Sequence, residues 1–151
     1  MKCIAGFAAL AILLGAAAAH ADSPIAQLMA VTELKANPGG HFITAADING
    51  TSIKVLVDTG ATAVALSYED ARDAGLRPGS LDFNVPVATA NGVTQAARVT
   101  IERIAIEGLE VEDVDGLVLP EGALNGTLLG MSFLSRLASF KIEDGVLYLK
   151  D

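Results

Sequence analysis

Paired turn residues between β-branched segments constrain the fold of this chain most strongly. Asn49-Gly50, Asn91-Gly92 and Asp144-Gly145 each separate two stretches rich in Val, Ile, Leu and Thr. Asn, Asp and Gly tolerate the positive φ angles of a two-residue hairpin turn, so we expect antiparallel hairpins at all three places. The stretches themselves predict short strands around residues 41–48, 52–57, 85–87, 94–101, 104–106, 109–111, 117–119, 140–142 and 146–149.

Two short helices are expected among these strands. Ser67 lies three residues before Asp70, a spacing typical of a helix N-terminus, and the helix over residues 68–74 should end at Gly75. A second short helix should follow Gly130, with Met131, Leu134 and Leu137 on one face.

The overall pattern predicts an all-β fold. Apolar residues alternate at positions 99 and 101 and then at 104 and 106, a change of phase that predicts a β-bulge near Glu102-Arg103. Many short strands with only two short helices indicate a small closed or nearly closed β-barrel.

The first 40 residues divide into two expected segments. Residues 1–21 resemble a signal peptide, because Lys2 precedes an apolar run that ends in Ala19-His20-Ala21. We expect export to the periplasm or secretion, and an uncleaved N-terminal anchor in the inner membrane is the alternative. Residues 22–40 are expected to be an approach segment or linker that ends in Asn37-Pro38-Gly39-Gly40, so the folded domain should span residues 41–151.

Composition argues against several classes of function. The formal net charge of −8 disfavours nucleic acid as a partner, because an acidic surface repels phosphates. Cys3 lies in the leader, so the mature chain has no thiol for catalysis or zinc binding. His41 would be the one histidine left for a serine triad, and no Gly-x-Ser-x-Gly motif is present. Four acidic residues lack calcium-loop spacing, so we expect no metal site: Glu110, Glu112, Asp113 and Asp115.

One short segment concentrates the chemistry. In Val57-Asp58-Thr59-Gly60-Ala61, an ionisable side chain follows a buried strand directly. A carboxylate in that position is costly unless its charge is used or satisfied. Gly60 lets the backbone turn and approach closely, and Thr59 supplies a hydroxyl beside the carboxylate. Asp58 is therefore the candidate catalytic residue.

The segment Asp58-Thr59-Gly60-Ala61 resembles the active-site loop of retropepsin-like aspartic proteases (clan AA). Leu128-Leu129-Gly130 before a short helix is similar to the apolar-apolar-Gly motif that crosses beside that loop in the family, and Asn91-Gly92 falls where the family has its flap. The resemblance covers about residues 41–149 and is strongest to bacterial single-domain members that are exported or tethered to a membrane.

The resemblance implies an aspartic endopeptidase with one lobe per chain. The family mechanism uses two carboxyl groups that share a proton, and this chain has a single Asp-Thr-Gly. It therefore implies a homodimer, in which Asp58 of two subunits forms the dyad that activates water. No cofactor is implied, and a membrane is a partner only if the leader stays uncleaved.

The resemblance also assigns supporting roles. Thr59, Gly60 and Gly130 would support the active-site loop. Contacts with a polypeptide substrate would come from Gly60, Ala61, Thr62, Ala90, Asn91 and Gly92. Retroviral members often carry an acidic residue soon after the Ala, whereas Thr62 and Ala63 follow it here.

Two alternatives to a general endopeptidase stay open. The same fold could bind an extended peptide by strand addition without cutting it. The chain could also be a self-processing protease whose substrate is its own segment 22–40.

Overall fold

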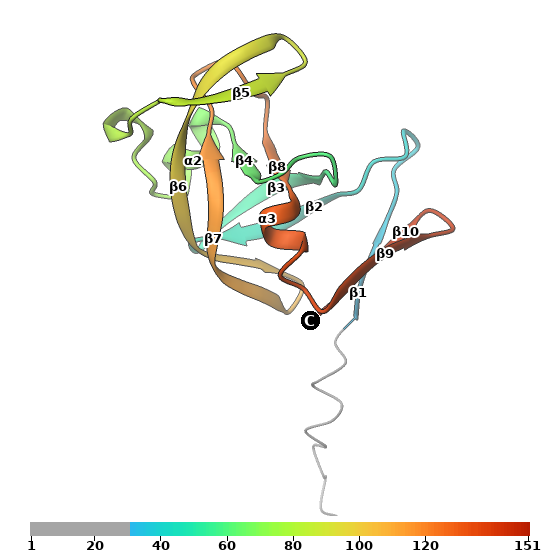
Figure 1. Ribbon diagram of the computed structural model, residues 1–151. Helices are drawn as coiled ribbons and strands as arrows, with labels where there is room; N and C mark the ends of the chain where they lie inside the picture. Colours follow the sequence, from blue (N-terminus) through green and yellow to red (C-terminus); the bar gives the residue numbers. More distant parts are fainter. Residues whose placement is uncertain (1–30) are drawn as a thin grey trace, which may run out of the picture.

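The computed structural model describes residues 31–151 (Figure 1). The expected signal peptide and the first part of the expected linker lie outside the described residues. Within residues 31–151, no helix is long and apolar enough to cross a membrane.

Six strands form a closed barrel. The strands are β2 (Ile43–Ile48), β3 (Thr51–Val57), β8 (Thr127–Leu129), β4 (Val64–Leu66), β7 (Leu109–Val118) and β6 (Gly92–Ile106), in their order around the sheet. The barrel closes because β6 also pairs with β2, with Ile48 opposite Ile104. The last strand, β5 (Val85–Thr89), extends the sheet as a hairpin with the first part of β6. The predicted all-β barrel is confirmed.

The barrel interior explains why the strands form where they do. Each strand directs a branched apolar side chain inward, where it is almost completely removed from water. Burial of such side chains stabilises the fold by roughly 1.5–3 kcal/mol each. The largest of these fully buried strand residues include Ile48, Val55, Leu66, Ile101, Ile104, Ile106, Leu109 and Leu129.

Two short helices pack against the strands of the barrel. Helix α2 (Tyr68–Asp73) begins after Ser67, whose hydroxyl accepts a hydrogen bond from the Asp70 backbone N–H at 3.1 Å. A 3-10 turn (Pro78–Ser80) follows it. Helix α3 (Met131–Leu134) begins after Gly130 and buries Phe133 and Leu134. The two predicted helices are confirmed.

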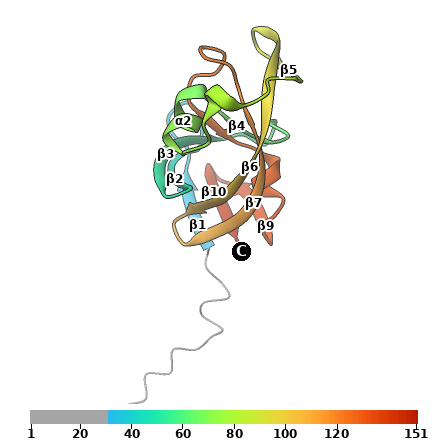
Figure 2. The ribbon, with the colours of Figure 1, turned by 90° about the vertical axis from the view of Figure 1, so that its left-hand side faces the viewer.

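A second sheet lies beside the lower end of the barrel (Figures 1 and 2). It consists of β1 (Val31–Lys35), β10 (Val146–Lys150) and β9 (Ser139–Glu143), in the order β1-β10-β9. The structure differs here from the expected linker over residues 22–40, because part of that segment is a strand. The alternation of apolar and polar residues in residues 31–35 is short and isolated in the sequence. The segment is a strand because it pairs with β10, with Leu34 opposite Leu147.

The alternation of apolar residues does change phase near Glu102-Arg103, but neither strand contains an extra residue. The β6–β7 register is the same before and after the change, with Ile101 opposite Val114 and Arg103 opposite Glu112. Instead, both strands turn together, and Asp113 takes a positive φ of 51°. The Arg103 backbone is drawn to the β2–β3 turn, where its N–H donates to Asn49 Oδ1 at 3.1 Å. The predicted bulge is therefore a kink shared by two strands.

Candidate active site

Asp58 follows the last residue of strand β3 directly and lies at one end of the barrel. β3 runs parallel to β8, with Val57 opposite Leu129, and the Asp58 backbone N–H donates to the Leu129 carbonyl at 3.1 Å. Val57 is buried, whereas the Asp58 side chain is half-buried. The two strands thus hold the backbone of Asp58 while its carboxylate remains accessible.

The loop after β3 is tight and organised around the carboxylate. Asp58 Oδ1 accepts the Gly60 backbone N–H at 2.9 Å, and the Asp58 carbonyl accepts the N–H of Ala61 at 3.2 Å. Thr59 and Gly60 are exposed at the tip of this loop. The loop therefore presents one oriented carboxylate and an exposed threonine hydroxyl at the surface of a single chain.

Gly130 lies against the far end of the same loop. The N–H of Met131 donates to the carbonyl of Ala61 at 2.8 Å. A Cβ on Gly130 would lie 2.7 Å from that carbonyl oxygen and 2.3 Å from the carbonyl oxygen of Ala63. Only glycine allows this approach, because real Cβ atoms do not come so close to backbone oxygens.

Ser132 completes the support, and the sequence analysis did not single it out. Its hydroxyl accepts the Val64 backbone N–H at 2.9 Å and donates to the Asp115 carbonyl at 2.6 Å. One side chain of α3 thereby ties the end of the active-site loop to β7. The sequence signal for this supporting role was a serine two residues after Gly130. Its hydrogen-bond partners, Val64 and Asp115, lie 68 and 17 residues away in the sequence.

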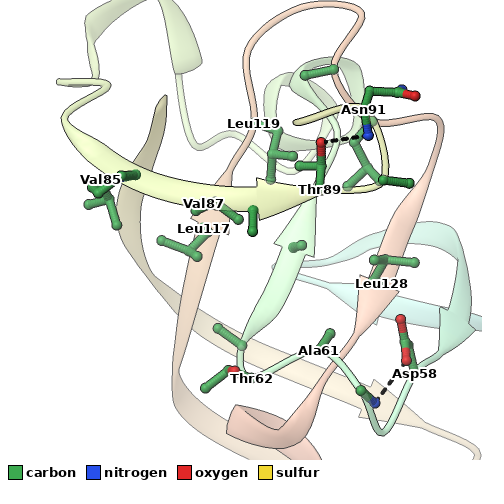
Figure 3. Close-up of a pocket in the computed structure, with 18 of the residues that line it drawn as sticks. Asp58, Ala61, Thr62, Val85, Val87, Thr89, Asn91, Leu117, Leu119 and Leu128 are labelled. Atoms are coloured by element: carbon green, nitrogen blue, oxygen red, sulfur yellow. Dashed lines mark hydrogen bonds between the residues drawn. The ribbon is translucent and has the colours of Figure 1, made fainter. Parts of the chain in front are cut away.

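The predicted flap is present as the β5–β6 hairpin. Its tip is held by Thr89, whose hydroxyl accepts the Asn91 backbone N–H at 3.2 Å and donates to the Gly92 carbonyl at 2.8 Å. Val93, beside the tip, has 73% of its surface exposed. The hairpin faces the loop of Asp58 across an open space (Figure 3).

That space is a groove of about 790 Å³. Figure 3 shows Asp58, Ala61 and Thr62 on one wall, with Val87, Thr89 and Asn91 on the flap opposite. The size suits several residues of an extended peptide, since ligand pockets span roughly 300–1,000 Å³. Asp58 is the one ionisable side chain among the residues that line it.

The structure brings most of the predicted site residues to this groove. Those lining it are Asp58, Gly60, Ala61, Thr62, Ala90 and Asn91. Thr59 and Gly130 lie outside the lining, in the supporting positions described above. Gly92, predicted to contact substrate, is also outside it. It begins β6 with a φ of +110° and pairs with Thr89, so the two-residue turn is Ala90-Asn91 and not the predicted Asn91-Gly92.

Other parts of the wall were not predicted as site residues. They share small or apolar side chains, which in the sequence look like ordinary strand and loop positions. They are Ala63, Ala65, Val85, Pro86, Val87, Ala88, Thr89, Leu117, Leu119, Ala123, Leu124, Asn125 and Leu128.

The other charged groups within residues 31–151 do not line the groove. Arg103 pairs with Glu110 at 2.8 Å and Asp47 at 2.9 Å, and the hydrogen bond to Glu110 raises the pKa of the guanidinium above its usual value. Within residues 31–151, no group of three or more His, Cys, Asp or Glu side chains is placed to hold a metal ion. The groove therefore has the character of an apolar cleft with a single carboxylate on one wall.

Known proteins are similar to this chain in sequence. The family model described as "gag-polyprotein putative aspartyl protease" matches residues 44–136. An uncharacterised protein from the cobV 5′ region of a Sinorhizobium species is 46% identical over 112 residues, which are 74% of this chain and 48% of that protein. An uncharacterised protein of Rickettsia prowazekii is 39% identical over 110 residues, 73% of this chain and 47% of that protein. The chain thus spans about half the length of the curated relatives it matches.

Solved structures agree in fold. A retropepsin-like aspartic protease from Rickettsia conorii superposes with a TM-score of 0.73 at 36% identity, over 80% of this chain and 90% of that one. EIAV protease complexed with the inhibitor HBY-793 matches with a TM-score of 0.57 at 22% identity, over 71% of this chain and 97% of that one, and at this identity the likeness concerns the fold alone. The Asp-Thr-Gly loop, the glycine beneath it and these matches together show that the chain belongs to the retropepsin-like aspartic protease family.

Proposed function

We propose that this protein is an aspartic endopeptidase that hydrolyses peptide bonds with a dyad of Asp58 from two subunits. The observation that carries the proposal is the position of Asp58, the one ionisable group lining a groove of peptide-binding size. A protein that only bound peptides would have no need for an oriented carboxylate with free access to the groove.

The second carboxylate has to come from another copy. Two carboxyl groups about 3 Å apart share one proton, so one is an acid and the other a base. Among the residues lining the groove, no second Asp or Glu is available within the chain. A two-fold dimer that brings the two Asp58 loops together would supply the missing group.

The chemistry then balances without a cofactor. The ionised carboxylate removes a proton from water as the water oxygen bonds to the peptide carbonyl carbon, and the protonated carboxyl donates to the carbonyl oxygen. The tetrahedral intermediate collapses when one of its hydroxyls returns a proton to the ionised carboxylate, the C–N bond breaks, and the leaving nitrogen takes up a proton from the protonated carboxyl. Closure of the β5–β6 flap over the groove would exclude bulk water during these steps.

Removal of the Asp58 carboxylate tests this proposal most directly. Purified wild type and Asp58→Asn are incubated with a diverse peptide library at several acidic pH values, and cleavage is followed by mass spectrometry. We expect cleavage by wild type and at least a 1,000-fold loss in the variant, with Asp82→Asn, an exposed carboxylate outside the groove, active as wild type. Peptides bound by wild type but left intact would instead favour the binding module, and wild-type cleavage by Asp58→Asn would exclude this site.

Mixing experiments test the shared dyad. Excess Asp58→Asn chains should inactivate wild type by forming mixed dimers, each with one carboxylate. Specific activity should also fall when the enzyme is diluted below the dimer dissociation constant. Activity proportional to protein concentration throughout a range where sedimentation shows monomers would contradict a two-chain site.

A further inference from the structure

A row of side chains crosses the outer face of the barrel along one wall of the groove. Residues directly opposite each other in neighbouring strands direct their side chains to the same face of a sheet. The registers of five strands give the row, in the order Leu56, Leu128, Ala65, Leu117 and Arg98. Leu128, Ala65 and Leu117 line the groove. The row therefore continues the groove wall as far as β6, where it reaches Arg98.

Burial shows that Arg98 belongs to the outer face. Its neighbours along β6, Ala97 and Val99, direct their side chains into the barrel and are buried. Arg98 itself is exposed, and Leu117 opposite it is half-buried at the groove. The guanidinium group is therefore on the face that carries the groove and outside the core.

The flap hairpin leads to the same residue. Val85 lines the groove at the end of β5 away from the flap tip, and it pairs with Ala96. Arg98 follows two residues later on β6, so its side chain is on the same side of the strand as that of Ala96. Figure 3 shows Val85 at the opposite end of the groove from Asp58. Both registers of β6 thus place Arg98 beside the end of the groove that is remote from Asp58.

Arg98 carries a charge that no ion pair of the fold uses. Of the residues that pair with strand residues lining the groove, it is the one with a charged side chain. The ion pairs within residues 31–151 involve the basic side chains of Arg72, Arg103 and Lys141, and none involves Arg98. This holds even for Asp115, which is diagonal to Arg98 in the β6–β7 ladder. A free guanidinium group beside an apolar groove is suited to a carboxylate, which it binds through two parallel N–H donors.

The register gives the distance between Arg98 and the bond that would be cut. Leu128 lies beside Asp58, because the N–H of Asp58 donates to the carbonyl of Leu129, the next residue. From Leu128 on β8, the row crosses β4 and β7 to reach Arg98 on β6, and these strand spacings of about 4.8 Å add up to about 14 Å. An extended peptide along the groove covers this distance in about four residues, at about 3.3 Å per residue.

We propose that Arg98 selects substrates with an acidic residue about four positions from the cut bond, by binding the Asp or Glu carboxylate. This inference rests on the proposed function, because a cleaved bond defines the position. In a two-fold dimer, Arg98 of the partner subunit would select an acidic residue at the same distance on the other side of the bond. The preferred substrate is therefore an apolar segment with a carboxylate near each end.

Peptide binding to the Asp58→Asn protein measures this preference without cleavage. The probes are acetylated and amidated peptides of about ten residues with an apolar centre, in which Glu, Gln or Lys occupies each position in turn. At a position about four residues from the centre, we expect Glu to bind about two- to fivefold more tightly than Gln, as for an exposed ion pair. Lys should bind more weakly than Gln there, and high salt should reduce both differences. Isothermal titration calorimetry gives the Kd values.

Substitutions of Arg98, made in the same Asp58→Asn protein, test whether its charge causes the preference. Arg98→Gln should bind the Glu and Gln peptides equally, and Arg98→Glu should bind the Lys peptide most tightly. Because Arg98 is exposed, both variants should keep the native circular dichroism spectrum. A purely structural role would change all affinities alike, so a reversed order requires contact with the peptide side chain. An unchanged preference for Glu in Arg98→Glu would overturn the proposal.

Arg72→Glu is the matched control. It makes the same change in net charge on α2, beside Asp73. The carbonyl of Asp73 accepts the hydroxyl of Thr51, which begins β3 at the end away from Asp58. This variant should keep the order Glu, Gln, Lys of the parent protein. The same reversal in Arg72→Glu as in Arg98→Glu would show an effect of net charge and would also overturn the proposal.

Cleavage of the same peptides by protein with Asp58 intact separates this inference from the proposed function. If both hold, kcat/KM should follow the order of the affinities. A preference for Glu in binding without any cleavage would support the role of Arg98 and contradict the proposed function. Cleavage with equal kcat/KM for Glu and Gln at every position would overturn the role of Arg98 and leave the endopeptidase standing. Neither binding nor cleavage of any probe would count against both.

Discussion

Gly130 packs directly against the carbonyl oxygen of Ala63, where a Cβ would come within 2.3 Å of that oxygen. The neighbouring contact, from Met131 N–H to the Ala61 carbonyl, is a hydrogen bond of 2.8 Å. The shape of the active-site loop therefore depends on a residue that follows it by about 70 positions and carries no functional group.

Gly130→Ala should accordingly displace the loop and reduce both stability and activity. Neither contact can be relieved at a low energetic cost, because both atoms that the new Cβ would meet are backbone oxygens. We expect a loss of at least about 1–3 kcal/mol in the free energy of unfolding, measured by urea denaturation. Gly79→Ala is the matched control, since its Cβ would meet only the Tyr68 hydroxyl at 3.6 Å. Equal stability of the two variants would show that the loop is not held by this contact.

Ser132→Ala should weaken the active site by removing hydrogen bonds that support the active-site loop. The change removes an acceptor for Val64 N–H and a donor to the Asp115 carbonyl, which should cost about 1–3 kcal/mol of stability. Ser135→Ala is the control, because Ser135 makes only a local bond to the Met131 carbonyl on the exposed side of α3. If Ser132 positions the loop, kcat for a cleaved peptide should fall in Ser132→Ala while KM changes little. Unchanged kcat would assign Ser132 to stability alone.

Thr59 should stabilise the dimer rather than the monomer. It is exposed at the tip of the loop, and a hydroxyl there can bond across a two-fold axis. We expect Thr59→Val to weaken dimerisation about tenfold, from the loss of two symmetric hydrogen bonds of about 0.5–1.5 kcal/mol each. Thr59→Ser, which keeps the hydroxyl, should dimerise like wild type in sedimentation equilibrium. Normal assembly of the valine variant would exclude a role of this hydroxyl between subunits.

Turnover should depend on pH as a bell in the acidic range. Two carboxyl groups that share one proton are active only when singly protonated. The rate should therefore fall at low pH, where both are protonated, and at high pH, where both are ionised. Both limbs of the bell reflect the pair of carboxyl groups and not either residue alone. A pH–rate profile measured with one cleaved peptide gives both limbs. A rate that rises steadily into the alkaline range would point to another catalyst.

Cleaved peptides should carry apolar residues on both sides of the broken bond. Apart from Asp58, the groove is lined by uncharged and mostly small or apolar side chains, so a charged residue bound there would lose hydration without gaining a partner. Sequencing the products of a peptide library, with Asp58→Asn as the blank, measures the preference. The net charge of −8 should further disfavour strongly acidic peptides, and less so at high salt. A preference for charged residues at the cut would contradict substrate binding in this groove.

The sequence by itself determined the features that depend on local chemistry. Turn dipeptides such as Asn49-Gly50 and Asp144-Gly145 require positive φ angles, and the structure has them at all four residues. Ser67 caps α2 through a hydrogen bond with Asp70, which lies only three residues further along the chain. The Asp-Thr-Gly loop, the flap hairpin and the glycine before α3 are likewise short motifs, so the barrel and the principal candidate residue could be predicted.

Only the tertiary structure decided the features that depend on distant partners. Strand β1 exists because β10 lies beside it, and the change of phase at Arg103 is a kink because Asn49 holds its backbone. The groove walls and Ser132 acquire their roles from segments brought together by the closure of the barrel. Contacts between residues so far apart depend on which strands pair, and local propensity does not contain that information.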